Sequence, residues 1–189
     1  MDLNQFDEIF QQQMREAQEF VDSEKIRNIM GEMAVTHFKD SFENEGFTDE
    51  TLEKWKEVSR RDPSSGWYGH DGFSDNQSKA NKKRNKDRAK EGQPALIGRF
   101  SKTRATDKIL TGGTRDLREG IIYVTTEKGA RVTSDTPYGR VHQFGMSAKI
   151  YGKGTFQMPK RPFMGKSVVL KANIEAKIAR ELSKIFNKK

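Results

Sequence analysis

The chain has no cysteine among its 189 residues, so disulfide bridges, thiolate metal sites and cysteine nucleophiles are excluded. Apolar side chains are scarce as well, at 33% of the sequence, and charged residues make up another 33%. No stretch reaches the about 20 consecutive apolar residues that a membrane-spanning helix requires, and residues 1–16 lack the basic segment and apolar run of a secretory signal. We therefore expect a protein with one modest core that is made in the cytoplasm and has no membrane partner.

Motifs that carry catalysis or hold a cofactor are also missing from the sequence. The three histidines, His37, His70 and His142, lie far apart and form none of the paired spacings typical of metal sites. Neither the Gly-x-x-x-x-Gly-Lys-Ser/Thr loop that binds nucleotide phosphates nor the Gly-x-Ser-x-Gly turn that presents a serine nucleophile occurs. The sequence therefore predicts no catalytic residue, no cofactor and no metal, in a protein that is not an enzyme.

Apolar residues at helical spacing mark both ends of the chain. The first amphipathic helix is predicted from the spacing of Phe6, Ile9, Phe10 and Met14. A second helix is expected to begin after Ser23, a favourable N-cap, and to stop at Gly46. Residues 48–58 predict a short helix that docks Trp55. The last predicted helix starts near Lys166, and its apolar stripe consists of Leu170, Ile174, Ile178, Leu182 and Ile185.

Between these helices the pattern changes to strands. Residues 121–126 are β-branched or aromatic, and a turn that ends at Gly129 leads into a second strand at 130–134, which predicts a hairpin. A short helix at 138–144, ended by Gly145, and a glycine-rich connection at 146–156 are expected to follow. The predicted fold is α+β: a single small domain with an antiparallel hairpin packed against N-terminal helices and a long C-terminal helix. Its parts are residues 1–58, a basic loop at 59–95, and residues 96–189.

The basic loop carries much of the net charge of +8. Little in residues 59–95 can build a core, so we expect a long exposed loop or arm. Two interpretations of its cations stay open: a solvated segment, or a contact with DNA or an acidic partner. No aromatic residue lies between the cations, so base stacking is not expected. The candidate contact residues are Lys79, Lys82, Lys83, Arg84, Lys86, Arg88 and Lys90.

Two short motifs in the second half of the chain are distinctive. Residues 136–145 read Thr-Pro-Tyr-Gly-Arg-Val-His-Gln-Phe-Gly, and residues 158–165 read Met-Pro-Lys-Arg-Pro-Phe-Met-Gly. The first resembles the Pro-Tyr-Ala-x-x-His-Gln-x-Gly signature of the phage virion morphogenesis family, the Mu-like tail-completion proteins. The second is similar to that family's Pro-x-Arg-Pro-Phe-x-Gly signature. The resemblance covers residues 108 to about 184, and Gly139 stands where the family usually has alanine.

The residue types within both motifs favour packing. The aromatic residues of the first motif, on a short helix, suit a partly wet contact, and the two prolines of the second stiffen a segment that places Phe163 as an anchor. For His142 and Gln143 two roles stay open: hydrogen bonds to backbone that fix the following loop, or direct contact with another subunit. The predicted assembly and packing residues are Tyr138, Val141, His142, Gln143, Phe144, Gly145, Pro159, Arg161, Pro162 and Phe163.

The resemblance implies a structural virion protein, a tail-completion or tail-terminator subunit at the head–tail junction, or neck, of a bacteriophage. Such proteins commonly close a six-fold ring around the DNA channel. The implied partners are copies of the same chain and the tail-tube and neck or connector proteins. DNA in the channel is a further candidate on the charge of residues 79–90 alone. Assembly would occur in the host cytoplasm. The alternative is a nucleic-acid-binding accessory protein that acts through the basic residues 79–90.

Overall fold

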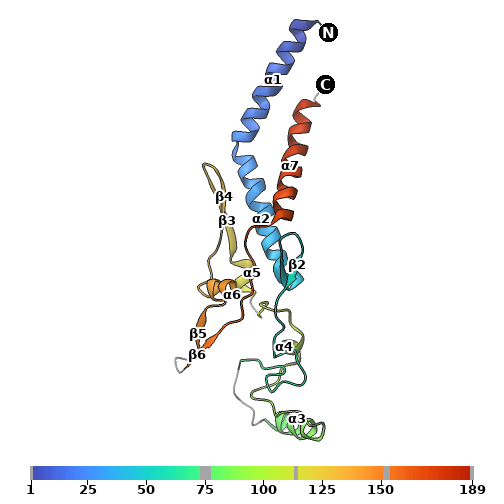
Figure 1. Cartoon of the computed structure of the whole chain (residues 1–189), viewed down its shortest axis with the longest axis vertical. Coiled ribbons are helices and arrows are strands. Elements are labelled where there is room, and N and C mark those ends of the chain that lie inside the picture. Colours follow the sequence, from blue (N-terminus) through green and yellow to red (C-terminus); the bar gives the residue numbers. More distant parts are fainter. Residues whose placement is uncertain (1, 73–77, 113–114, 151–153, 188–189) are drawn as a thin grey trace. The chain divides into compact units, whose positions relative to one another are not determined.

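The computed structural model describes residues 2–72, 78–112, 115–150 and 154–187. Helices alternate with short antiparallel strand pairs, which confirms the predicted α+β class (Figure 1). The chain forms two compact units: residues 1–54 together with 116–189, and residues 55–115. None of the described helices is long and apolar enough to cross a membrane.

Two consecutive helices open the first unit, α1 (Leu3–Asp22) and α2 (Glu24–Asn44). Ser23 separates them, and its hydroxyl accepts a hydrogen bond from the backbone N–H of Ile26 at 3.4 Å, which confirms the predicted N-cap. The second helix ends before the predicted stop. Glu45 takes the left-handed conformation of a helix C-cap, with φ of 51°, and Gly46 already belongs to a strand.

The described residues of this unit include three two-stranded antiparallel sheets. Their strands are β1 (Gly46–Thr48) with β2 (Leu52–Lys54), β3 (Ile121–Thr126) with β4 (Gly129–Ser134), and β5 (Ser147–Ile150) with β6 (Gly154–Gln157). The predicted hairpin at 121–134 is confirmed, but the short helix expected at 48–58 is wrong. Phe47 is buried against the Phe38 ring, and that packing, with the strand hydrogen bonds, overrides the local helix signal. Trp55 is buried, as predicted.

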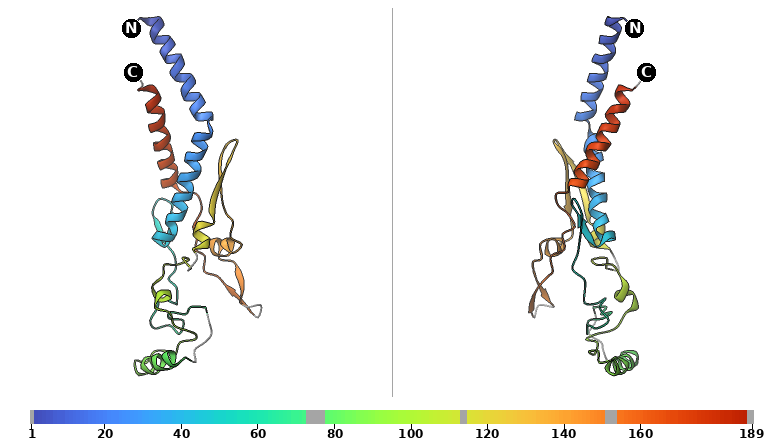
Figure 2. Two further views of the ribbon diagram at one scale, coloured as in Figure 1. Left: turned by 180° about the vertical axis from the view of Figure 1, so that it is seen from behind. Right: turned by 45° about the vertical axis from the view of Figure 1, so that its right-hand side comes forward.

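A tight contact between α2 and the β3–β4 hairpin organises the core, and both views of Figure 2 show them side by side. A Cβ atom at Gly31 would lie 2.1 Å from the Tyr123 ring, so only glycine permits this approach. The remaining elements of the unit are α5 (Asp116–Glu119), α6 (Gly139–Phe144) and α7 (Val168–Phe186). The β5–β6 hairpin lies where the sequence suggested only a glycine-rich connection.

The second unit contains α3 (Lys79–Lys90) and α4 (Lys102–Thr106). The prediction of an exposed loop throughout residues 59–95 is therefore wrong for residues 79–90, which form α3. Ser78 caps α3, and the buried Asn81 side chain donates to the Gly98 carbonyl at 2.8 Å. Hydrogen bonds from polar side chains to backbone carbonyls stabilise this unit. Its apolar core is small and includes Leu96 and Ala105. Hydrophobic periodicity does not reveal such packing.

Candidate assembly site

The two signature segments of the sequence lie against each other in the first unit. The backbone N–H of Arg161 donates to the His142 carbonyl at 2.8 Å, and the N–H of Met158 donates to the Met146 carbonyl at 3.2 Å. Gly145 ends α6 with φ of 66°, and a Cβ atom there would lie 2.9 Å from the backbone nitrogen of Lys160. A glycine is therefore required where the chain leaves α6.

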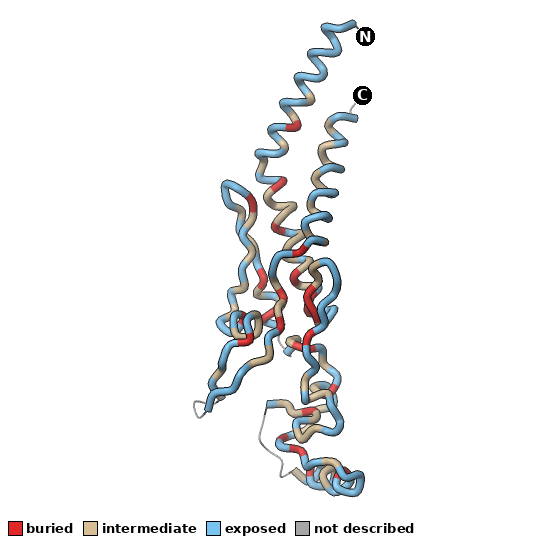
Figure 3. The backbone as a smooth tube through the Cα atoms, viewed as in Figure 1, coloured by how far each residue is buried: buried red, intermediate tan, exposed pale blue. Residues whose placement is uncertain are grey.

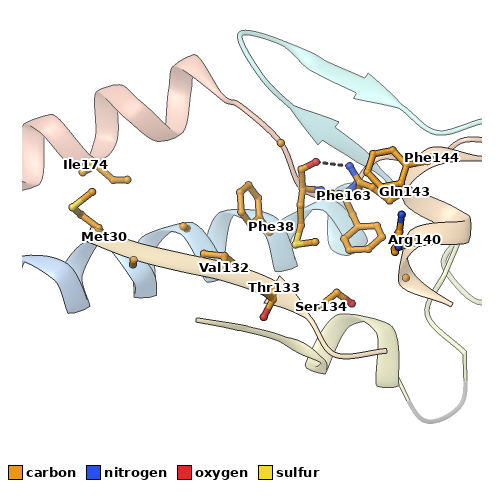
Figure 4. Close-up of a pocket in the computed structure, with 15 residues that line it drawn as sticks. Met30, Phe38, Val132, Thr133, Ser134, Arg140, Gln143, Phe144, Phe163 and Ile174 are labelled. Atoms are coloured by element: carbon orange, nitrogen blue, oxygen red, sulfur yellow. Dashed lines mark hydrogen bonds between the residues drawn. The ribbon is translucent and has the colours of Figure 1, made fainter. Parts of the chain in front are cut away.

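The Gln143 side chain joins α6 to the second signature. Its Oε1 accepts hydrogen bonds from the backbone N–H groups of Phe163 at 2.9 Å and Met164 at 3.2 Å. Its Nε2 donates to the Met164 carbonyl at 2.5 Å (Figure 4). One half-buried amide thus satisfies three backbone groups of a segment outside the described strands. Of the two roles left open for Gln143, the structure shows hydrogen bonding to backbone.

Phe163 is the apolar centre of the site. Its side chain is fully buried, and its ring centroid lies 5.3 Å from that of Phe42 on α2. The Ser41 hydroxyl donates to the Phe163 carbonyl at 3.3 Å. The neighbouring Arg161 is buried as well, while Pro159 and Pro162 are half-buried. The second signature is therefore part of the core.

His142 lies between the two segments. Burial lowers the pKa of its imidazole, and the positive charge of Arg161 lowers that pKa further. Its Nδ1 is buried and has no hydrogen-bond partner among the described residues. The Tyr138 ring meets the imidazole edge to face, with centroids 6.2 Å apart. This environment favours the neutral form of the imidazole, which packs against the Tyr138 ring.

An apolar groove of about 680 Å³ opens beside these residues. Figure 4 shows it between α2, β4, α6, the segment around Phe163 and the beginning of α7. Most of its lining is carbon, and Arg140 supplies a positive charge. The lining residues that matter below are Met30, Phe38, Val132, Arg140, Phe144 and Ile174. Apolar residues at helical spacing indicate that a helix buries one face, but no sequence pattern reveals that part of such a face is left uncovered.

Comparison with known families explains the two signatures. The chain matches the model of the phage virion morphogenesis family over residues 77–183. This chain belongs to the phage virion morphogenesis family. Members are structural and assembly proteins of bacteriophages, so the family assigns this chain to virion assembly. No curated protein and no solved structure gives a significant match.

The residues of the family signatures fall into two groups in the structure. Gln143, Gly145 and Phe163 serve the interior, through hydrogen bonds, a left-handed turn and core packing. Tyr138 and Phe144 point outward, with 41% and 59% of their surface exposed. Val141 is half-buried on the same short helix. The side chains of the outward group are exposed and can contact another protein.

The seven cations predicted as a contact group also fall into two groups, two arginines held by packing and five exposed lysines. The Arg88 guanidinium is buried and donates to the carbonyls of Pro94, Pro63 and Ser65 at 2.9, 2.8 and 3.0 Å. The Arg84 guanidinium stacks on the Phe100 ring, 3.9 Å from its centroid. These two arginines hold the second unit together. The five exposed cations of α3 are Lys79, Lys82, Lys83, Lys86 and Lys90.

Proposed function

We propose that this family member is a tail-completion or tail-terminator subunit whose copies close a ring at the head–tail junction of a phage. Family membership and the outward aromatic residues of the signatures support this role. The observation that carries the proposal is a pair of uncovered apolar surfaces on the first unit, one on α1 and one in the groove. A chain that functions alone rarely leaves such surfaces in water.

The first surface is a stripe along α1. Its large apolar residues are 42–87% exposed, and Figure 3 shows the helix exposed along most of its length. The helix contacts α7 near Gln13, whose amide donates to the Phe186 carbonyl, but this contact leaves the stripe uncovered. The stripe consists of Leu3, Phe6, Ile9, Phe10 and Met14.

The second surface is the groove beside α6, which suits the α1 stripe of another copy. An amphipathic helix that lays its apolar face into an apolar groove is a common mode of protein recognition. The charges also fit, because residues 2–22 carry six acidic side chains against one arginine and the groove includes Arg140. Two different surfaces that fit each other give a head-to-tail contact, which closes into a ring when the rotation between subunits allows it.

A ring of this kind has two faces that can meet different partners. In the proposed position one face meets the end of the tail tube and the other meets the neck or connector proteins. The exposed aromatic residues outside the groove, Tyr138 beside α6 and Phe156 on the β5–β6 hairpin, are candidates for these contacts. Aromatic side chains are enriched where proteins bind each other.

The test is the mass of the purified protein in solution, measured by multi-angle light scattering alone and then with isolated phage tails. We expect a species of six times the 21.7 kDa chain mass that binds one end of the tail. The variant Phe6→Glu/Phe10→Glu places charges on the α1 stripe and is expected to remain a folded monomer. The matched control Gln5→Glu/Gln11→Glu adds the same charge to the polar side of α1 and is expected to assemble.

Two results would contradict the proposal. One is a wild-type chain that stays monomeric in the presence of tails and does not bind them. The other is a Phe6→Glu/Phe10→Glu variant that assembles as well as its control, since the stripe would then contribute nothing to the contact.

A further inference from the structure

The exposed lysines of α3 share one face of the helix. At about 100° per residue, positions 79, 82, 83, 86 and 90 fall within an arc of about 100°. The only acidic residue inside the helix, Asp87, lies about 40° beyond the edge of this arc and pairs with Lys90 at 3.6 Å. We call these five residues the lysine face: Lys79, Lys82, Lys83, Lys86 and Lys90.

The opposite face of α3 holds the helix in the second unit. Asn81 and Arg88 are buried and bond to backbone carbonyls, and the Asn85 side chain accepts the N–H of Leu96 at 2.9 Å. Arg84 stacks on Phe100 at the flank. These contacts orient the helix so that the lysine face points into solvent. The positive charge is therefore presented by a fixed helix, not by a loop.

The composition of the lysine face indicates the class of partner. Protein–protein contacts are depleted in lysine and need an apolar or aromatic centre, and the lysine face includes neither. Phosphate groups, by contrast, are bound by lysine as a point charge. From Lys79 to Lys90 the helix extends about 16 Å, a length over which duplex DNA carries about five phosphates on each strand.

We propose that the lysine face of α3 binds the phosphate backbone of double-stranded DNA irrespective of base sequence. At base edges, arginine or lysine pairs with guanine, and asparagine or glutamine pairs with adenine. The arginines and asparagines of α3 are turned inward or held by packing. The lysines that remain supply point charges for phosphate but lack the set of side chains that would distinguish one base sequence from another. This contact goes beyond the assembly role proposed above and does not depend on it, since a single chain carries the whole face.

The first experiment measures binding of the purified full-length chain to a fluorescent 20-base-pair duplex by anisotropy, at a protein concentration where it is monomeric. If about four phosphates are neutralised, the slope of log K against log salt is about −3.6, so the affinity falls about 150-fold between 50 and 200 mM salt. Duplexes of unrelated sequence are expected to bind equally. Polyglutamate at the same charge concentration is expected not to be bound.

The second experiment changes the lysine face itself. The triple variant Lys82→Gln/Lys83→Gln/Lys86→Gln is expected to reduce the salt slope by about 2.7, because each contact contributes about 0.9. Replacement of the same three residues by arginine retains the charge and is expected to retain binding, which separates loss of contact from loss of fold. Fluorescence of Trp67, in the same unit, reports whether that unit remains folded.

A matched control removes equal charge from exposed positions of the first unit. This control is the triple variant Lys128→Gln/Lys149→Gln/Lys171→Gln. It is expected to bind DNA with the same affinity as the wild type. Equal losses in the control and the α3 variant would overturn the proposal, because net charge alone would explain the binding. Capture of polyglutamate as tightly as DNA, or binding with no salt dependence, would overturn it as well.

Discussion

The amide of Gln143 is the part of the site whose energetic contribution can be derived most directly from the structure. The variant Gln143→Leu keeps the volume of the side chain and removes its hydrogen bonds. The N–H groups of Phe163 and Met164 and the Met164 carbonyl then lose their partner at a half-buried position. An unsatisfied buried group costs about 1–3 kcal/mol, and partial solvent access keeps each of the three groups near the lower limit.

We therefore expect Gln143→Leu to lower the free energy of unfolding by about 2–3 kcal/mol. For a chain of this length that corresponds to a decrease in Tm of roughly 5–10 °C. Urea unfolding followed by circular dichroism measures the global effect. Both tryptophans lie in the second unit, so amide hydrogen exchange of Phe163 and Met164 is the local measurement for the first unit.

Two controls separate the lost hydrogen bonds from the substitution itself. Gln143→Glu keeps an acceptor for both N–H groups and loses only the donor to Met164, so a smaller loss of stability is expected. Gln12→Leu removes an exposed glutamine whose amide bonds only to Glu16, and little change is expected. A Gln143→Leu variant whose free energy of unfolding lies within about 0.5 kcal/mol of the wild type, and whose Phe163 amide exchanges as slowly as before, would contradict this expectation.

Three further substitutions test neighbouring features. Gly145→Ala should cost about 2 kcal/mol or more in urea unfolding, since a left-handed φ and a Cβ 2.9 Å from the Lys160 nitrogen both oppose a side chain. Because burial lowers the pKa of His142, the unfolded chain binds a proton first, and wild-type stability should fall as the pH drops below the ordinary value of about 6.5; a His142→Asn variant that shows the same pH dependence contradicts this. Arg88→Met should destabilise the second unit by about 3 kcal/mol, seen by Trp67 fluorescence, because three carbonyls lose a charged donor.

Local signals in the sequence were sufficient for much of the first unit. Ser23 caps α2, Gly145 ends α6 in a left-handed conformation, and the strands at 121–126 and 129–134 pair as predicted. The information for each of these features lies within a few residues, in a hydroxyl, a missing Cβ or an alternation of apolar side chains. Such features can be predicted without knowledge of the tertiary contacts.

Features held by distant partners could not be predicted in this way. Arg88 was predicted to lie in an exposed loop or arm because little in residues 59–95 can build a core, yet it is buried and its partners Pro63 and Pro94 lie on either side of α3 in the chain. The β1–β2 hairpin contradicted the helix signal for a related reason, because the burial of Phe47 decides the conformation. Nothing near these residues in the sequence identifies the groups they contact.

Some residues of the family signatures point into the core and others point into solvent. Only variants of the second kind can test assembly without a change in stability. Truncation of the fully buried Phe163 costs about 3–5 kcal/mol, a large part of the 5–15 kcal/mol that stabilises a typical domain. A virion defect in such a variant would then reflect a shortage of folded protein. Phe144 belongs to the other signature and is 59% exposed, so its replacement by serine removes little that holds the subunit together. A loss of virion assembly in Phe144→Ser at unchanged unfolding free energy is therefore evidence for a contact between proteins, and the same loss in a Phe163 variant is not.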